Sequence, residues 1–232
     1  MKFDILIKRP IFAAIAAGIV LAMSGAANAQ GIKQEILDRM DGNYKTLTSL
    51  KANIKMDKTN ANLGDTESRS GSVNFLPKSK KHGMYIRLDW TTKPIQSMVV
   101  IDKRYQLYRP ELNQVIQGST DSAKSTGKAG NALAFLSMSR RELMDNYDIK
   151  YVGQEDLPGG VATWHLFMTP KGKASYKSAD LWVDKDGMPR QARVTEMNND
   201  TSVILLTNIE KNPTIKADVF KLDTKGAKVV EG

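Results

Sequence analysis

Apolar and polar residues alternate with a period of two along most of the chain, a pattern typical of half-buried β-strands. The clearest case is the run in which Met84, Ile86, Leu88 and Trp90 stand at every second position. The same alternation predicts strands at residues 50–56, 73–76, 97–102, 105–108, 148–152, 162–168, 179–184, 191–197 and 202–209. About ten strands joined by short turns, such as the one at Asp186-Gly187, predict an antiparallel sheet, barrel or sandwich.

One segment before the strands has a helical period instead. Ile32, Ile36, Met40 and Tyr44 recur every four residues, which predicts a helix over residues 34–44 with one apolar face.

A second interruption lies in the middle of the strand pattern. Residues 117–130 are small and polar and predict a loop, and the apolar run 131–138 that follows is helix-like. Ser139 and Glu142 then have the spacing of a capping box, which predicts that another helix begins there. This insertion either closes one end of a barrel permanently or acts as a movable lid.

The N-terminus has the three-part layout of a secretory signal peptide. Lys2, Lys8 and Arg9 precede the uncharged run 11–23, and Ala27-Asn28-Ala29 supplies small residues for cleavage. We therefore expect a signal peptide at residues 1–29, cleaved after Ala29, and a single domain at residues 30–232.

Composition excludes several kinds of chemistry. The 232 residues include no cysteine, so disulfides, thiolate metal sites and a cysteine nucleophile are impossible, as is acylation of the chain on cysteine. The net charge of +9 favours an anionic partner. Because an exported protein rarely meets nucleic acid, we expect lipid surfaces or acidic docking partners and no nucleic acid.

Motifs of catalysis are not found in the sequence. His82 and His165 lie far apart, without the spacing of metal ligands, and neither G-x-S-x-G nor H-E-x-x-H occurs. We interpret His165 as a structural histidine and expect no enzyme, no metal and no cofactor.

An apolar interior is the remaining candidate for function. A barrel of this size can hold a ligand. Six of the 11 methionines fall in the expected strands or the inserted helices, and their flexible side chains suit a cavity that accepts acyl chains: Met56, Met84, Met98, Met138, Met144 and Met168. An ordinary closed core explains the same periodicity equally well.

The chain resembles the periplasmic outer-membrane lipoprotein carrier family (the LolA type). The likeness lies, in family order, in residues 71–77, 84–90, 97–114, 132–152 and 179–230. Within these, Tyr108-Arg109-Pro110 with Gln114, and Asn212-Pro213-Thr214-Ile215 leading to Phe220, look like family motifs. The chain departs from the family at Leu76, where the family commonly has arginine before the proline.

The resemblance implies a mainly β (α+β) fold: a half-open antiparallel β-barrel with an N-terminal helix and a helical lid over an apolar cavity. We expect the cavity to be lined by Ile54, Met56, Phe75, Met84, Ile86, Leu88, Trp90, Val99, Ile101, Leu107, Trp164 and Leu166. We expect the lid to contribute Leu133, Phe135, Leu136 and Leu143. The inward face of each strand is an inference from alternation.

The resemblance also implies a function. A monomeric periplasmic carrier would take acylated lipoproteins or lipid from an inner-membrane lipoprotein-release complex and deliver them to an outer-membrane receptor. The alternatives are a regulatory, sensor or lipid-binding module on the same scaffold and, in another class, an exported hydrolase that uses His165.

Overall fold

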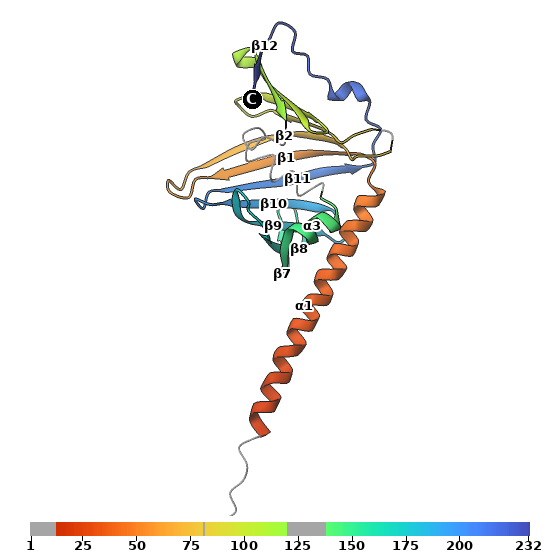
Figure 1. Cartoon of the computed structure of the whole chain (residues 1–232), viewed down its shortest axis with the longest axis vertical. Coiled ribbons are helices and arrows are strands. Elements are labelled where there is room, and N and C mark those ends of the chain that lie inside the picture. Colours follow the sequence, from red (N-terminus) through yellow and green to blue (C-terminus); the bar gives the residue numbers. More distant parts are fainter. Residues whose placement is uncertain (1–12, 81, 120–137) are drawn as a thin grey trace, which may run out of the picture.

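A single large sheet dominates the computed structural model, which describes residues 13–80, 82–119 and 138–232 (Figure 1). Its 12 strands have the order β12-β6-β5-β4-β3-β2-β1-β11-β10-β9-β8-β7. The strands are β1 (Leu50–Thr59), β2 (Thr66–Leu76), β3 (Tyr85–Trp90), β4 (Gln96–Ile101), β5 (Arg104–Arg109), β6 (Gln114–Ser119), β7 (Tyr147–Leu157), β8 (Val161–Pro170), β9 (Tyr176–Asp184), β10 (Pro189–Glu196), β11 (Thr201–Lys211) and β12 (Lys228–Glu231).

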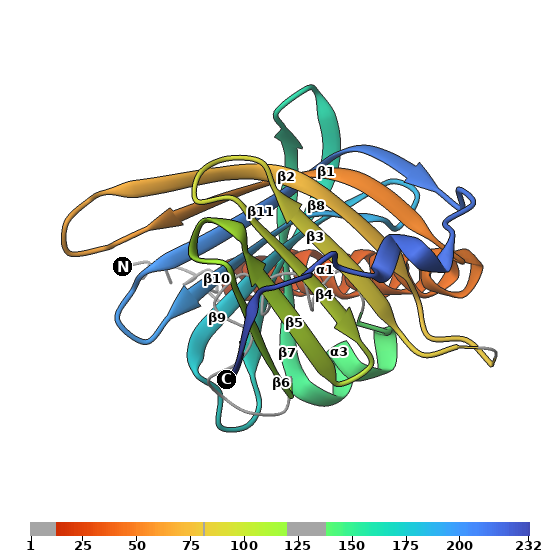
Figure 2. The same cartoon turned by 90° about the horizontal axis from the view of Figure 1, so that it is seen from above.

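The sheet is open and almost entirely antiparallel. Only the pairing of β12 with β6 is parallel. Among the described residues, β12 and β7 each have one neighbour, so the sheet does not close into a complete barrel. The strands at the two ends of the order run steeply across the central ones (Figure 2), as the twist of a large sheet requires. The expected mainly-β fold with an N-terminal helix is confirmed.

Helix α1 (Ala13–Thr46) contains the predicted segment and extends beyond it on both sides. Ile36, Leu37 and Met40 are buried against the sheet, as their helical spacing predicts. The earlier part of the helix extends away from the strands (Figure 1). None of the helices in the described part of the chain is long and apolar enough to cross a bilayer.

The turn between β9 and β10 shows why α1 fits closely. Gly187 has a φ of +78°, and a Cβ atom there would lie 2.2 Å from the carbonyl oxygen of Arg39. Glycine is therefore needed both for the turn and for the approach of the helix. The predicted hairpin turn at Asp186-Gly187 is confirmed.

The short helix α3 (Arg140–Asn146) begins as its sequence predicts. Ser139 is the N-cap, its side chain accepts a hydrogen bond from the Glu142 amide, and the Glu142 carboxylate accepts one from the Ser139 amide. The capping box is thus present, and it fixes the point at which the chain returns towards β7.

Several strand assignments differ from the sequence-based expectation. Neither β6 nor β12 was expected, residues 117–119 of β6 were expected in a loop, and β7 continues to Leu157, past the expected end at residue 152. β2 begins at Thr66, seven residues before the expected start at residue 73. The first part of β2 is mostly exposed, since it belongs to a hairpin that extends past the buried part of the sheet (Figure 2).

A strap formed by residues 212–227 leads from the end of β11 to β12 across one face of the sheet (Figure 2). It contains the turn η2 (Ala217–Phe220), while η1 (Pro110–Leu112) connects β5 and β6. The Arg87 guanidinium donates to the carbonyl oxygen of Val219 at 2.7 Å, and the Tyr85 and Phe220 rings lie 5.4 Å apart. The strap therefore covers part of β3 and joins the last strand to the far end of the sheet.

Candidate functional site

One face of the sheet, here called the inner face, carries a continuous apolar surface. The strand register aligns Ile54 with Leu206 and Met56 with Ile204 on one side of β1. On the other side of β1, Leu50 faces Phe75. Because alternation sends every second side chain to this face, one buried cluster extends from β3 through β1 to β8. Helices α1 and α3 contribute Ile36, Leu37 and Leu143 to it, so they lie against the inner face.

Most residues expected to line a cavity meet on this inner face. Nine of them belong to the buried cluster or pack against it: Ile54, Met56, Phe75, Met84, Ile86, Leu88, Trp90, Trp164 and Leu166. Leu107 faces Met98 in the register and so shares the face, although it is only partly buried. The alternation pattern thus identified the face correctly in β1, β2, β3 and β8.

Val99 and Ile101 lie on the opposite, outer face, and their expected inward orientation was wrong. In the register Met98 faces Leu88 and Val100 faces Ile86, which places these even-numbered residues of β4 on the inner face. The run of four apolar residues from Met98 to Ile101 has no alternation, so the sequence could not decide between its faces. Val99 faces Arg87, the residue that contacts the strap.

The lid is only partly described. Leu143 in α3 is fully buried in the cluster, whereas Leu133, Phe135 and Leu136 fall outside the described residues. Arg140 connects α3 to α1, because its guanidinium forms an ion pair with Asp38 and donates to Gln34 Oε1 at 2.8 Å. Two helices far apart in sequence are thereby joined over the inner face.

A pocket of about 520 Å³ opens where α1, α3, β7 and the end of β8 meet. Its apolar part includes Leu37, Tyr147 and Ile149, which also belong to the buried cluster or pack against it. Lys33 and Lys171 stand among its polar lining. The pocket therefore connects apolar surface with cationic groups at the β7 edge of the sheet.

Tyr147 and Tyr176 form a polar pair at the margin of the apolar face. Their hydroxyl oxygens lie 2.5 Å apart. Burial, reinforced by the hydrogen bond with Tyr147, raises the pKa of Tyr176 far above its ordinary value of about 10. The pair satisfies two hydroxyls that would otherwise interrupt the hydrocarbon surface.

Arg69 was missed by sequence reasoning although it lies on the inner face. It faces Met56 in the register and is 9% exposed. Its guanidinium carbon lies 4.7 Å from the centre of the Trp90 ring, and Nη2 donates to the carbonyl oxygen of Pro94 at 2.8 Å. Burial lowers the pKa of Arg69, against the opposing effect of Glu67. The signal that could have found it is the alternation of β2 continued back from Val73.

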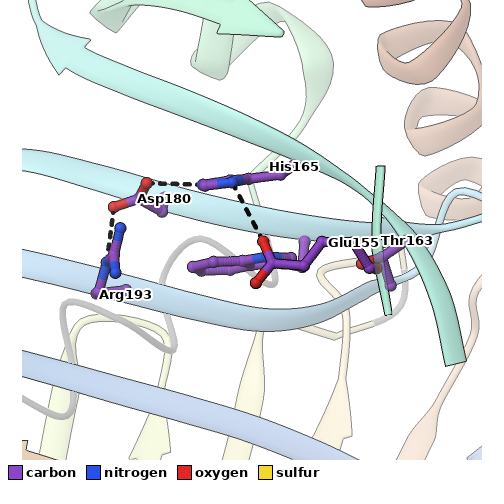
Figure 3. A network of polar contacts seen from close by, with 6 residues as sticks. Glu155, Thr163, His165, Asp180 and Arg193 are labelled. Atoms are coloured by element: carbon purple, nitrogen blue, oxygen red, sulfur yellow. Dashed lines mark hydrogen bonds and ion pairs between the residues drawn. The ribbon is translucent and has the colours of Figure 1, made fainter. Parts of the chain in front are cut away.

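His165 belongs to a polar network on the outer face (Figure 3). One ring nitrogen lies 2.7 Å from the Asp180 carboxylate and the other 3.4 Å from Glu155. Asp180 also accepts from Arg193 at 3.0 Å, and the His165 ring stacks on Trp182 at 4.3 Å. The interpretation of His165 as a structural histidine stays a prediction.

The network has no features of a metal centre. Within residues 13–80, 82–119 and 138–232, no three histidine or carboxylate side chains converge as ligands would. The expected absence of catalysis and of cofactors remains an expectation.

Comparisons with known proteins give a consistent result. The family described as outer membrane lipoprotein carrier protein LolA matches residues 45–223. An outer-membrane lipoprotein carrier protein of Cupriavidus taiwanensis is 27% identical over 173 residues, which cover 74% of each chain.

Solved structures share the fold at low identity. An uncharacterized conserved protein of Thermus thermophilus aligns with a TM-score of 0.55 and 16% identity, covering 86% of this chain and 99% of the other. MucB, in the complex structure of Pseudomonas aeruginosa MucA/MucB, aligns with a TM-score of 0.51 and 16% identity over 84% of this chain and 62% of the other.

Proposed function

The chain belongs to the outer membrane lipoprotein carrier protein LolA family, and we propose that it is a periplasmic carrier that holds the acyl chains of lipoproteins against its inner face. The observation that carries this proposal is the continuous apolar face formed by both halves of the sheet beneath α1 and α3. Each methylene group removed from water contributes about 0.8 kcal/mol, so several acyl chains can be held without covalent chemistry.

The route of the cargo follows from the same proposal. The first 29 residues would direct export and be removed after Ala29, leaving residues 30–232 as the working domain. The carrier would receive lipoproteins from an inner-membrane release complex and transfer them to an outer-membrane receptor. Helix α3, the described part of the expected lid, would have to move for the acyl chains to enter.

Binding of a fluorescent diacylated lipopeptide to residues 30–232 tests the proposal. Met98→Glu places a carboxylate on the inner face at a partly buried position, where the fold tolerates it better than in the fully buried cluster. We expect the dissociation constant to rise at least about tenfold, because hydrocarbon cannot solvate the new charge. Native mass spectrometry of the protein from its host should also show bound lipid or lipoprotein.

The matched control is Ile101→Glu, which introduces the same charge on the outer face of the same strand, at a position 41% exposed. It should leave the affinity unchanged. No binding of the lipopeptide to the unaltered protein, or an equal loss in both variants, contradicts the proposal.

A second candidate is a regulatory or sensor module on the same scaffold. The fold is shared with MucB, which has been solved in complex with MucA, so this architecture also occurs in a protein with a protein partner. A stable partner recovered by crosslinking from the periplasm, together with no lipopeptide binding, would favour this function over the carrier.

A further inference from the structure

The pocket at the β7 edge has a charge that a lipoprotein's neutral acyl chains do not require. Lys33 from α1, Lys150 from β7 and Lys171 after β8 surround it, whereas Asp148 is the one acidic residue among those that line it. Three cations against one anion favour a negatively charged occupant.

Two of these lysines are available to bind an anion. Lys171 is engaged, since its ammonium group donates to the carbonyl oxygen of Met144 at 2.6 Å and so holds the end of α3. Lys33 and Lys150 have no ion-pair partner in the described part of the chain. Lys33 is half-buried, so an anion beside it is partly shielded from water.

The apolar side of the pocket continues into the cluster on the inner face. Leu37 is 1% exposed, and Tyr147 and Ile149 also contact the cluster. A ligand with an alkyl chain could therefore place its chain against the apolar face while its head remains near the lysines. The volume of about 520 Å³ is within the range of small-molecule sites.

We propose that this pocket binds the phosphate-bearing headgroup of an anionic phospholipid, whose acyl chain lies against the inner face. The proposal rests on the proposed function for the apolar part and extends it with a preference for headgroup charge. Lys33 approaches the phosphate from α1 on the inner face, and Lys150, which alternates to the outer face of the edge strand β7, approaches it around that edge. Asp148 opposes the phosphate.

Two lysophospholipids with the same 14-carbon chain separate these contributions. We expect residues 30–232 to bind lysophosphatidylglycerol about tenfold more tightly than lysophosphatidylcholine in calorimetry at low salt, with a smaller ratio at 0.5 M NaCl. Both lipids carry the same phosphodiester, so the ratio reports on the net charge of the headgroup, because the lysines repel the choline cation of lysophosphatidylcholine. If neither lipid binds, the proposed function fails as well, whereas equal binding of both overturns only the headgroup site.

Substitutions test which lysines cause the preference for the anionic lipid. Lys33→Gln with Lys150→Gln should reduce the ratio to about one, mainly by weakening the binding of lysophosphatidylglycerol. Asp148→Asn should raise the affinity for lysophosphatidylglycerol about threefold. Lys225→Gln with Lys228→Gln removes the same charge near the opposite edge of the sheet, beside or within β12, and should keep the ratio.

Two outcomes overturn the site. One is a ratio that survives the double substitution at Lys33 and Lys150. The other is displacement of lysophosphatidylglycerol by 10 mM inorganic phosphate, which would identify a site for the free anion instead of the lipid.

Discussion

Two polar side chains on the outer face of the sheet share one buried carboxylate as their hydrogen-bond acceptor. Asp180 is 2% exposed and accepts hydrogen bonds from both His165 and Arg193 (Figure 3). A buried carboxylate that accepts from two donors contributes to the stability of the fold, because both donors lose their partner when the carboxylate is removed.

Asp180→Ala should lower the free energy of unfolding by about 1–3 kcal/mol, chiefly because the mostly buried His165 ring loses its acceptor, whereas Arg193 is partly exposed to water. Urea titration followed by tryptophan fluorescence measures the change. Asp186→Ala, at an exposed position in the following turn, should alter it by less than about 0.5 kcal/mol. Equal effects of the two substitutions would show that the network contributes nothing.

For single residues, the sequence predicts the face of the sheet on which a side chain lies better than it predicts which other side chains it contacts. Ile54 and Leu88 lie in strands with clear alternation, and both are buried on the expected face. Val99 lies in an unbroken apolar run, where alternation gives no information. Arg69 is recognisable only when β2 is known to begin at Thr66, and its contact with Trp90 joins two strands whose pairing the sequence does not state.

Among the elements, α3 is joined to α1 by the polar contacts of Arg140 and by the burial of Leu143 in the cluster that both helices share. Arg140 contacts Asp38 and Gln34, while the adjacent Arg141 is exposed and, among the described residues, pairs within α3 with Asp145. The two neighbouring arginines therefore offer a direct comparison of an inter-helix contact with a local one.

Arg140→Gln should increase amide hydrogen exchange in α3 about two- to fivefold, because a partly exposed ion pair contributes up to about 1 kcal/mol. Exchange measured by mass spectrometry on α3 peptides gives the result. Arg141→Gln should leave the rates of these peptides within about twofold of the unaltered protein. Unchanged exchange in Arg140→Gln would mean that the apolar contacts of Leu143 alone hold the helix.

Elements with strong local signals were predicted, and elements that depend on distant partners were not. The capping box at Ser139 and the turn at Asp186-Gly187 are local and were found. β12 has only four residues and is defined by its parallel pairing with β6, which lies far earlier in the chain. Such a pairing leaves little trace in the short sequence of either strand.

Over the whole molecule, the strap links the centre of the open sheet to its β12 end. It leaves β11 near the centre of the order, crosses the outer face over β3 and delivers β12 to the edge at β6. Phe220 is 3% exposed and is its main buried anchor.

Phe220→Ala should lower the free energy of unfolding by about 3–5 kcal/mol, because it opens a cavity between the strap and Tyr85. Chemical denaturation measures this loss, and limited proteolysis should then cut within residues 212–227. Val229→Ala, in β12 but 56% exposed, should have a small effect. Equal stability of Phe220→Ala and the unaltered chain would show that the anchoring of the strap contributes nothing to the free energy of unfolding.

The pairing of β1 with β11 also determines when the protein can acquire its structure. The backbone amide of Thr48, just before β1, donates a hydrogen bond to the side-chain oxygen of Asn212, 164 positions later in the sequence. The central ladder cannot form until the ribosome has made nearly the whole chain, and long loops must close before that ladder gains any stability. During most of its synthesis the polypeptide therefore lacks its central sheet, and a chain in that condition is a suitable substrate for a translocation channel that admits only unfolded segments.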